Sequence, residues 1–241
     1  MTKEQVLAIH DVAGLRQLGP CNFMDRDMTA VEFGHIAEVC GAFWIRPDVQ
    51  DPNIPHALLT KGGHSNGFIN TLVVLSYTNL CHILAHQLVN RIRRAYDGPI
   101  NWVVGSDHAG AALSHSVAFI LNARHDFTEK GPDGTQVWRR HRIPAGEIVL
   151  QVEELMTTSG TLMAVRNGIR AGNPEPVTLA PVVGVLVHRS DVTEIEDTPV
   201  ISTFHFDITN WTPEGCPLCP IGSKALPPKK IWEQFVAKGK P

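Results

Sequence analysis

Residues 148–169 read IVLQVEELMTTSGTLMAVRNGI, and this stretch decides which fold the sequence predicts. It begins with an apolar run that ends at two adjacent carboxylates, Glu153 and Glu154. A short loop of small hydroxylic residues follows, and apolar residues then recur at helical spacing from Leu162 to Ile169. The pattern predicts a buried strand, a tight loop and a helix.

The loop between this strand and this helix has the composition of a phosphate site. It reads Thr157, Thr158, Ser159, Gly160, Thr161, so hydroxyls and backbone N–H groups gather at a helix N-terminus, where the helix dipole favours an anion. The acid pair could accept hydrogen bonds from sugar hydroxyls or face a cation. A turn whose Thr and Ser only cap the helix explains the loop alone, but not the acids at this offset. Together the two features predict a site for a phosphorylated sugar.

The same stretch resembles the phosphoribosyl-diphosphate (PRPP) motif of the type I phosphoribosyltransferase family. That motif has an apolar run, two acids, two apolar residues, and then Thr-Thr-Gly-Gly followed by Thr or Ser. Here Glu154 stands where Asp is more usual, and Ser159 stands where Gly is usual. Ser at this position requires that the loop not need a positive φ there. The resemblance implies that Glu153 and Glu154 hold ribose hydroxyls and that residues 157–161 hold the 5′-phosphate.

Composition narrows the class of protein. The chain has 241 residues, of which 43% are hydrophobic, which suits one globular domain with an appended piece. A net charge of −3 provides no basic field for nucleic acid polymers. No apolar run is long enough for a membrane span, and the first residues lack a signal-peptide pattern. With five cysteines and no secretory signal, we expect reduced thiols and a cytoplasmic protein.

Residues 58–71, LLTKGGHSNGFINT, form a polar turn between apolar flanks. They resemble the base-binding stretch of orotate phosphoribosyltransferases, and the residues that keep its register are Gly62, His64, Ser65, Phe68 and Asn70. Lys61 stands where Ser is usual, and Gly63 stands where a basic residue is usual. Lys61 could still offer its ammonium group to an anionic base or to diphosphate, whereas the alternative is a plain hairpin with a solvated lysine.

A second strand, loop and helix are predicted over residues 101–120. The unit resembles the diphosphate-binding loop of the family, which implies PRPP contacts for Gly105 and Ser106. Asp107 and His108 are expected to be helix-start residues without a catalytic role. A further strand over residues 182–187 completes a βαβαβ series and predicts a parallel sheet.

Residues 127–143, FTEKGPDGTQVWRRHRI, place cations around a predicted turn. They resemble the mobile active-site loop of one orotate phosphoribosyltransferase subgroup. On that resemblance Lys130, Arg139 and Arg140 neutralise the departing diphosphate while the closed loop excludes water. The alternative is an exposed basic hairpin. After the strand at 182–187, the resemblance implies that Arg189 contacts the carboxylate of the base, although His188 replaces the usual Asp.

Two further groups raise the question of a metal. Cys216 and Cys219 form one CxxC motif, which supplies two thiolates where a structural zinc needs four ligands. His205 is a possible third ligand, but without a second pair we expect no zinc. His82 and His86 have i, i+4 spacing in a helix predicted over residues 79–96, and we expect a surface or partner-facing pair there.

The predicted fold class is α/β, with the type I phosphoribosyltransferase fold. It has a doubly wound parallel sheet with helices on both faces, ligands at the carboxyl ends of the strands, and a small hood built from the termini. We expect a helical lead-in and hood at residues 1–60, the α/β core at 61–200, and a tail at 201–241 that completes the hood. The tail is predicted to end in a short helix that carries Trp232 and Phe235.

The resemblance implies an enzyme that transfers 5-phosphoribose from PRPP to orotate, giving orotidine 5′-phosphate and diphosphate in pyrimidine nucleotide synthesis. It also implies a homodimer and Mg²⁺, which would be bound mostly through substrate and water with help from Glu153 and Glu154. Two alternatives stay open. Because the departures at Lys61, Gly63 and His188 cluster at the implied base site, the base could differ from orotate. The chain could also be a non-catalytic regulator that binds PRPP or a nucleotide.

Overall fold

In a computed structural model of the chain, the structure describes residues 1–47 and 50–231. The predicted end helix with Trp232 and Phe235 lies outside these residues. Nowhere in the described ranges is there a helix with both the length and the apolar character of a membrane span.

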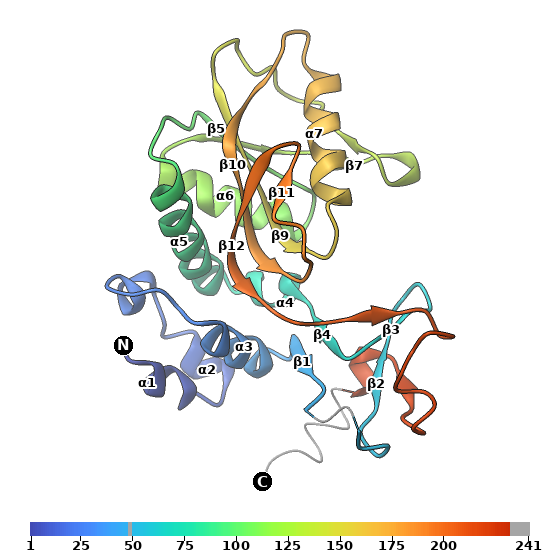
Figure 1. Ribbon diagram of the computed structural model, residues 1–241. Coiled ribbons are helices and arrows are strands. Elements are labelled where there is room, and N and C mark those ends of the chain that lie inside the picture. The colour runs from blue at the N-terminus through green and yellow to red at the C-terminus, as the bar shows by residue number, and fades with distance from the viewer. Residues whose placement is uncertain (48–49, 232–241) are drawn as a thin grey trace.

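A six-stranded sheet forms the centre of the molecule (Figure 1). Its order is β11-β12-β10-β9-β5-β6, and the neighbours from β12 to β6 pair in parallel, whereas β11 is an antiparallel edge. The strands are β5 (Trp102–Gly105), β6 (Arg124–Phe127), β9 (Ile148–Met156), β10 (Thr178–His188), β11 (Glu194–Ile195) and β12 (Thr198–His205). The predicted parallel sheet is confirmed.

Helices cover both faces of this sheet because its central strands are apolar on both sides. Alternate residues of a strand point to opposite faces, and Val103 accordingly packs with the helices α5 (Thr78–Ala95) and α6 (Ala109–Leu121). Its neighbours Trp102 and Val104 pack with the helix α7 (Gly160–Gly172). The doubly wound arrangement predicted from the sequence is therefore confirmed.

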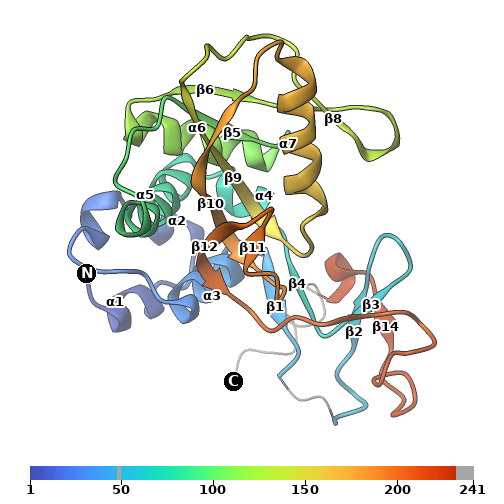
Figure 2. The same ribbon diagram turned by 45° about the horizontal axis from the view of Figure 1, so that its top comes forward.

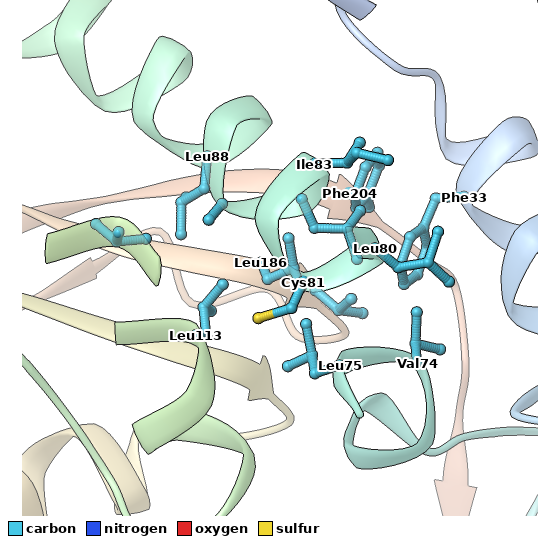
Figure 3. Close-up of a cluster of buried hydrophobic side chains, with 14 of the residues drawn as sticks. Phe33, Val74, Leu75, Leu80, Cys81, Ile83, Leu88, Leu113, Leu186 and Phe204 are labelled. Atoms are coloured by element: carbon cyan, nitrogen blue, oxygen red, sulfur yellow. The ribbon is translucent and has the colours of Figure 1, made fainter. Parts of the chain in front are cut away.

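The largest apolar cluster joins the N-terminal helices to the sheet (Figure 3). Phe33 of α3 (Ala30–Val39) stacks on Phe204 of β12, with ring centroids 4.4 Å apart. Leu80 and Ile83 of α5 fill the same region. The lead-in also contains α1 (Lys3–Leu7), α2 (Val12–Leu15) and the 3-10 helix η1 (Pro20–Phe23).

A separate four-stranded sheet, which we call the small sheet, is built from both ends of the chain (Figures 1 and 2). Its order is β13-β3-β2-β14, and its strands are β2 (His56–Leu58), β3 (His64–Ser65), β13 (Asn210–Trp211) and β14 (Ala225–Leu226). Beside it, β1 (Phe43–Ile45) pairs with β4 (Gly67–Ile69), and α4 (Thr71–Leu75) follows. The predicted domain boundaries stay a prediction; residue 60 lies in the turn between β2 and β3, and residue 200 lies within β12.

A buried arginine fastens α7 to the sheet. Arg166 is 1% exposed, and it donates hydrogen bonds to Gln151 Oε1 at 3.0 Å, to the Ile195 carbonyl at 3.0 Å and to Glu196 Oε2 at 3.1 Å. Arg170 also donates two hydrogen bonds to Glu196. The hydrogen bonds from Arg170 and Arg166 lower the pKa of Glu196 from 4.5 to about 2.

We predict that Glu196→Gln destabilises the protein in a pH-dependent way. The pKa of this carboxyl is lower in the folded than in the unfolded chain, so its stabilisation is present above pH 4.5 and is lost as the pH falls towards about 2. Denaturant unfolding should give a difference between wild type and variant that is largest near neutral pH and shrinks below pH 4.5. The exposed Glu194 of β11 supplies the control, Glu194→Gln. A difference that does not vary with pH would contradict the assignment.

Candidate functional site

The loop after β9 has the conformation that its sequence requires. Ser159 has φ −74° and ψ −5°, so the predicted absence of a positive φ at this position is confirmed. The Ser159 side chain makes no capping hydrogen bond to α7. The Gly160 N–H has only a long contact, 3.4 Å, with Thr158 Oγ1. The first amides of a 13-residue helix therefore remain available to an anion.

The acid pair lies within β9 instead of after it, because the strand continues to Met156. Glu153 is 2% exposed, and its Oε1 accepts hydrogen bonds from Ser106 Oγ at 2.9 Å and from the Glu154 N–H at 3.2 Å. The second oxygen of each carboxyl group, Oε2, is buried and has no hydrogen-bond partner among the described residues. Buried oxygens of this kind are normally paired. The two carboxyl groups interact with each other, since a side-chain hydrogen bond with Glu154 is among the causes that raise the pKa of Glu153.

Burial raises the pKa of Glu153 well above 4.5, and the adjacent Glu154 carboxyl raises it further. The hydrogen bond from Ser106 acts in the opposite direction but does not cancel these effects. The free protein therefore favours the neutral form of Glu153. A neutral carboxylic acid can donate as well as accept a hydrogen bond, which suits a sugar hydroxyl.

The loop after β5 lies against the acid pair through the hydrogen bond from Ser106 to Glu153. The predicted PRPP contacts of Gly105 and Ser106 stay a prediction. A Cβ atom on Gly105 would lie 2.5 Å from the Gly110 carbonyl, so only glycine allows α6 to start this close to the strand. A Cβ atom on Gly110 would lie 3.3 Å from Glu154 Oε2. Between these glycines, His108 has φ 58° and ψ −110°, a conformation that side chains rarely adopt. Strain of this kind concentrates at functional loops, and no feature of the residues around His108 predicts it.

A pocket of about 410 Å³ lies at the carboxyl ends of β9, β10 and β12. Its walls include Thr157 and Thr158 of the phosphate loop, Arg189 after β10, and residues 205–210 after β12. The structure therefore brings the predicted phosphate loop and the predicted base-reading arginine around one cavity. This edge of a doubly wound sheet is where such folds bind ligands.

Arg189 is held at the pocket from two sides. Its N–H donates to the Met156 carbonyl at 2.9 Å, and its Nη2 donates to Asn210 Oδ1 at 3.1 Å. Its Nε is buried without a partner among the described residues, and burial lowers the pKa of the guanidinium. The sequence analysis missed Asn210, because the contact crosses from the main sheet to β13.

Of the predicted site residues, Thr157, Thr158 and Arg189 line this pocket, whereas the acid pair, Gly105, Ser106 and residues 159–161 do not. The three residues predicted from the stretch 58–71 also lie away from its walls. Lys61 is exposed in the turn between β2 and β3. Phe68 lies in β4 opposite Trp44. Asn70 precedes α4 and donates its N–H to the Ala42 carbonyl at 2.7 Å. Their contact with a base stays a prediction.

The predicted mobile loop is a hairpin of β7 (Glu129–Lys130) and β8 (Gln136–Val137), joined by the 3-10 helix η2 (Pro132–Gly134). It lies against α7 (Figures 1 and 2), with a groove of about 390 Å³ between them. Lys130 is exposed, while Arg139 and Arg140 form ion pairs with Glu129. The arginines are therefore engaged within the loop, and their contact with diphosphate stays a prediction.

The histidines that the sequence analysis singled out are paired with each other. His82 and His86 of α5 have ring centroids 4.9 Å apart. His205 Nδ1 lies 3.1 Å from His188 Nδ1. The sequence analysis considered His205 as a third ligand beside Cys216 and Cys219. Among the described residues, the histidines that lie close to these cysteines are His56 and His64 instead.

The chain is similar in sequence to orotate phosphoribosyltransferases of known name. No protein-family model matches it. The orotate phosphoribosyltransferase of Pelotomaculum thermopropionicum is 32% identical over 173 residues, which cover 72% of this chain and 87% of that protein. The orotate phosphoribosyltransferase of Caldanaerobacter subterraneus is 30% identical over 176 residues, which cover 73% of this chain and 89% of that protein.

Solved structures share the fold. The orotate phosphoribosyltransferase of Aeropyrum pernix superposes with a TM-score of 0.51 at 16% identity, covering 72% of this chain and 93% of that one. The UMP synthase of Leishmania donovani superposes with a TM-score of 0.54 at 12% identity. That match covers 88% of this chain, which spans 43% of the length of the UMP synthase. At these identities the likeness is evidence for the fold alone.

We predict that Glu153→Gln stabilises the free protein at neutral pH. The pKa of this carboxyl is higher in the folded than in the unfolded chain, so its contribution to stability is full below pH 4.5 and is lost as the pH rises. Glutamine cannot ionise, and the gain over wild type should therefore grow from pH 5 upward in denaturant unfolding. Ser106→Ala should act in the opposite sense, because it removes the hydrogen bond that favours the ionised form. If the difference in unfolding free energy between wild type and Glu153→Gln were the same at all pH values, the raised pKa of Glu153 would be contradicted.

Proposed function

The chain belongs to the orotate phosphoribosyltransferase family, and from this premise we propose that it transfers 5-phosphoribose from PRPP to orotate. A ring nitrogen of orotate forms a bond to C1 of the ribose while the bond from C1 to diphosphate breaks, and orotidine 5′-phosphate results. The observation that carries the proposal is the pocket that Thr157, Thr158 and Arg189 share. It combines a site for a sugar phosphate with a guanidinium for a planar carboxylate.

The phosphate end of PRPP binds to residues 157–161 in this proposal. The free amides at the start of α7 and the hydroxyls of Thr157, Thr158 and Thr161 match the oxygens of the 5′-phosphate. The ribose hydroxyls then approach the unpaired Oε2 atoms of Glu153 and Glu154. Because Ser106 donates a hydrogen bond to Glu153 and Gly110 lies close to Glu154 Oε2, the diphosphate lies over the loop that joins Gly105 of β5 to α6.

Mg²⁺ is the cofactor that we assign to the site, since the two unpaired carboxyl oxygens offer the hard ligands that it prefers. Magnesium usually keeps several waters and binds through few carboxylates, so Glu153 and Glu154 would hold it mainly through water. When bound, the ion supplies positive charge that offsets the charge of the diphosphate.

The base binds at the Arg189 end of the pocket. Its carboxylate can receive two parallel hydrogen bonds from the guanidinium, whose Nε has no partner among the described residues. The hydrogen bond from Arg189 Nη2 to Asn210 Oδ1 fixes the orientation of the Arg189 guanidinium. Lys61 in the turn of the small sheet, with Phe68 of β4 and Asn70 before α4, completes the base site in this proposal.

Closure of the hairpin over the site supplies the remaining charge. Lys130 lies on its exposed surface, and Arg139 and Arg140 would exchange Glu129 for diphosphate oxygens. Breaking the ion pairs with Glu129 costs little free energy, because a surface ion pair contributes about 0–1 kcal/mol to stability. A homodimer that lends this hairpin to the neighbouring subunit is the assembly that we propose.

The direct test is PRPP-dependent consumption of orotate by the purified protein with Mg²⁺. Uracil, adenine, hypoxanthine and nicotinic acid are assayed in parallel. Turnover of orotate in clear excess over the other bases would support the proposal. Turnover of another base alone, or PRPP binding without turnover of any of them, would overturn it.

We predict that Arg189→Lys lowers kcat/KM for orotate by at least about tenfold. A hydrogen bond to a charged group is worth about 1.5–3 kcal/mol, and lysine cannot reproduce the paired geometry of the guanidinium. Uracil lacks the carboxylate, so its low activity should change little. Equal losses for orotate and uracil would instead show that Arg189 only supports the fold of the pocket.

We predict that Lys130→Ala lowers kcat by about 100-fold and leaves PRPP affinity nearly unchanged. Loss of a group that stabilises charge developing in the transition state typically has an effect of this size. Steady-state kinetics and PRPP calorimetry measure the two quantities, and Lys3→Ala on α1 is a matched surface control. If kcat survives and KM rises, Lys130 contributes to ground-state binding only.

A further inference from the structure

Four potential metal ligands meet inside the small sheet. They are His56 of β2, His64 of β3, and Cys216 and Cys219 of the segment between β13 and β14. One ligand atom from each lies within 4.8 Å of the others. The two histidines are about 150 residues away from the cysteines, and they meet because β3 pairs with β13 and β2 pairs with β14.

Four of the six separations between the ligand atoms are close to the edges of a tetrahedron around one metal ion, and all six lie within 4.8 Å. With Zn–S near 2.3 Å and Zn–N near 2.0–2.1 Å, ligand atoms in a tetrahedral site are about 3.3–3.8 Å apart. His56 Nε2 lies 3.0 Å from His64 Nδ1, 3.6 Å from Cys216 Sγ and 3.7 Å from Cys219 Sγ. Cys219 Sγ lies 3.2 Å from His64 Nδ1.

The hydrogen bonds of Ser223 favour one tautomer of His56. The Ser223 hydroxyl lies 2.8 Å from the Ile54 carbonyl, to which it donates, and accepts from Arg46 Nη1 at 3.1 Å. With the hydroxyl proton on Ile54, the 2.8 Å contact makes His56 Nδ1 the donor to Ser223. In the neutral ring Nε2 then carries the lone pair, and this nitrogen faces His64 and both thiols. One lone pair directed at three groups suits a cation at their centre.

We propose that His56 Nε2, His64 Nδ1, Cys216 Sγ and Cys219 Sγ bind a single zinc ion in a closed structural site. Two sulfur and two nitrogen ligands in tetrahedral geometry favour zinc, and four protein ligands leave no open position for catalysis. The hydrogen bond from His56 Nδ1 to Ser223 is the outer-shell contact that orients a metal-binding imidazole. The proposal replaces the sequence-based expectation that zinc is absent.

The small sheet needs such a link because its apolar core is small. The buried apolar residues of its cluster are Trp44, Ala57 and Ile231, and β3, β13 and β14 are each two residues long. Small units of this kind usually depend on a metal or on disulfides. The ion would join the segment 216–219 to the β2–β3 hairpin.

The site also has a consequence that rests on the proposed function. His64 ends the turn that carries Lys61, and β3 pairs with β13, whose Asn210 holds Arg189. Loss of zinc should therefore raise the KM for orotate several-fold more than it weakens PRPP binding, since the phosphate loop belongs to the main sheet.

The test is metal analysis of the full-length protein, purified without chelator or affinity tag and passed over a chelating resin. Mass spectrometry of the metals should find about one zinc ion per chain in the wild type. The double variant Cys216→Ser, Cys219→Ser should hold less than about a tenth of that amount. Cys21→Ser removes an exposed cysteine outside the cluster and should retain zinc. A wild-type protein without zinc, or a double variant that retains it, would overturn the proposal.

A second measurement does not depend on the folding of a variant. Zinc is removed from the wild type with a strong chelator, and Co²⁺ is added. Binding at the proposed site should produce thiolate-to-cobalt charge-transfer absorption and the strong visible bands of a tetrahedral ion. Their absence, or octahedral spectra without a thiolate band, would contradict the ligand set. A disulfide between Cys216 and Cys219 that persists in reducing buffer would contradict it too.

Thermal unfolding of the same samples separates this proposal from the proposed function. The metal-free wild type should unfold at a lower temperature, and added Zn²⁺ but not Mg²⁺ should restore the transition. Neither metal content nor unfolding requires turnover of orotate. If the orotate assay fails, the zinc proposal can still be tested by these results. If the protein holds no zinc, the orotate assay still tests the proposed function.

Discussion

The candidate site depends on the parallel pairing of β9 with β10. Their register places Leu155 opposite Val187 and Met156 opposite His188, so both strands end at the same level. The next N–H along β10, that of Arg189, donates to the Met156 carbonyl and extends the pairing by one step. The phosphate loop and the arginine therefore diverge from one point, and the pocket between them follows from strand register and not from loop conformation.

The acid pair shows a conflict between stability and ligand binding. A strand buried on both faces is a costly place for carboxyl groups, and the raised pKa of Glu153 reflects that cost. The same burial removes water from the two unpaired Oε2 atoms, and hydrogen bonds from Ser106 and the Glu154 N–H hold the Glu153 carboxyl group in place. In the proposed function, ribose hydroxyls and a cation can bind these two oxygens without first displacing other partners. The cost to the stability of the free protein is then offset when the ligand binds.

Local signals in the sequence predicted the main sheet, both strand–loop–helix units and the phosphate loop, because each depends on neighbouring residues. The loop after β5 does meet the acid pair, through Ser106 at Glu153 and Gly110 at Glu154, since parallel strands align their carboxyl ends. The failures involve contacts between distant segments. One CxxC motif gave no zinc ligand set, because His56 and His64 acquire that role only when β2 and β3 pair with strands from the C-terminal region. Asn210 was missed for a similar reason, whereas the strained backbone of His108 is a local feature that its residue type does not indicate.

The two halves of the site are held by different forces. The proposed phosphate half belongs to a sheet whose apolar clusters cover both faces, so its geometry is determined by packing. The proposed base half lies where the small sheet meets that core, and Arg189 with Asn210 joins them. The departures at Lys61 and Gly63 both occur in the turn of this small sheet, and Gly63 closes that turn by accepting the Leu59 N–H. A Cβ atom at Gly63 would lie 3.3 Å from the Trp211 carbonyl, a close contact with the backbone of β13. Glycine at this position therefore lets β13 approach the turn, and that approach brings Asn210 to Arg189.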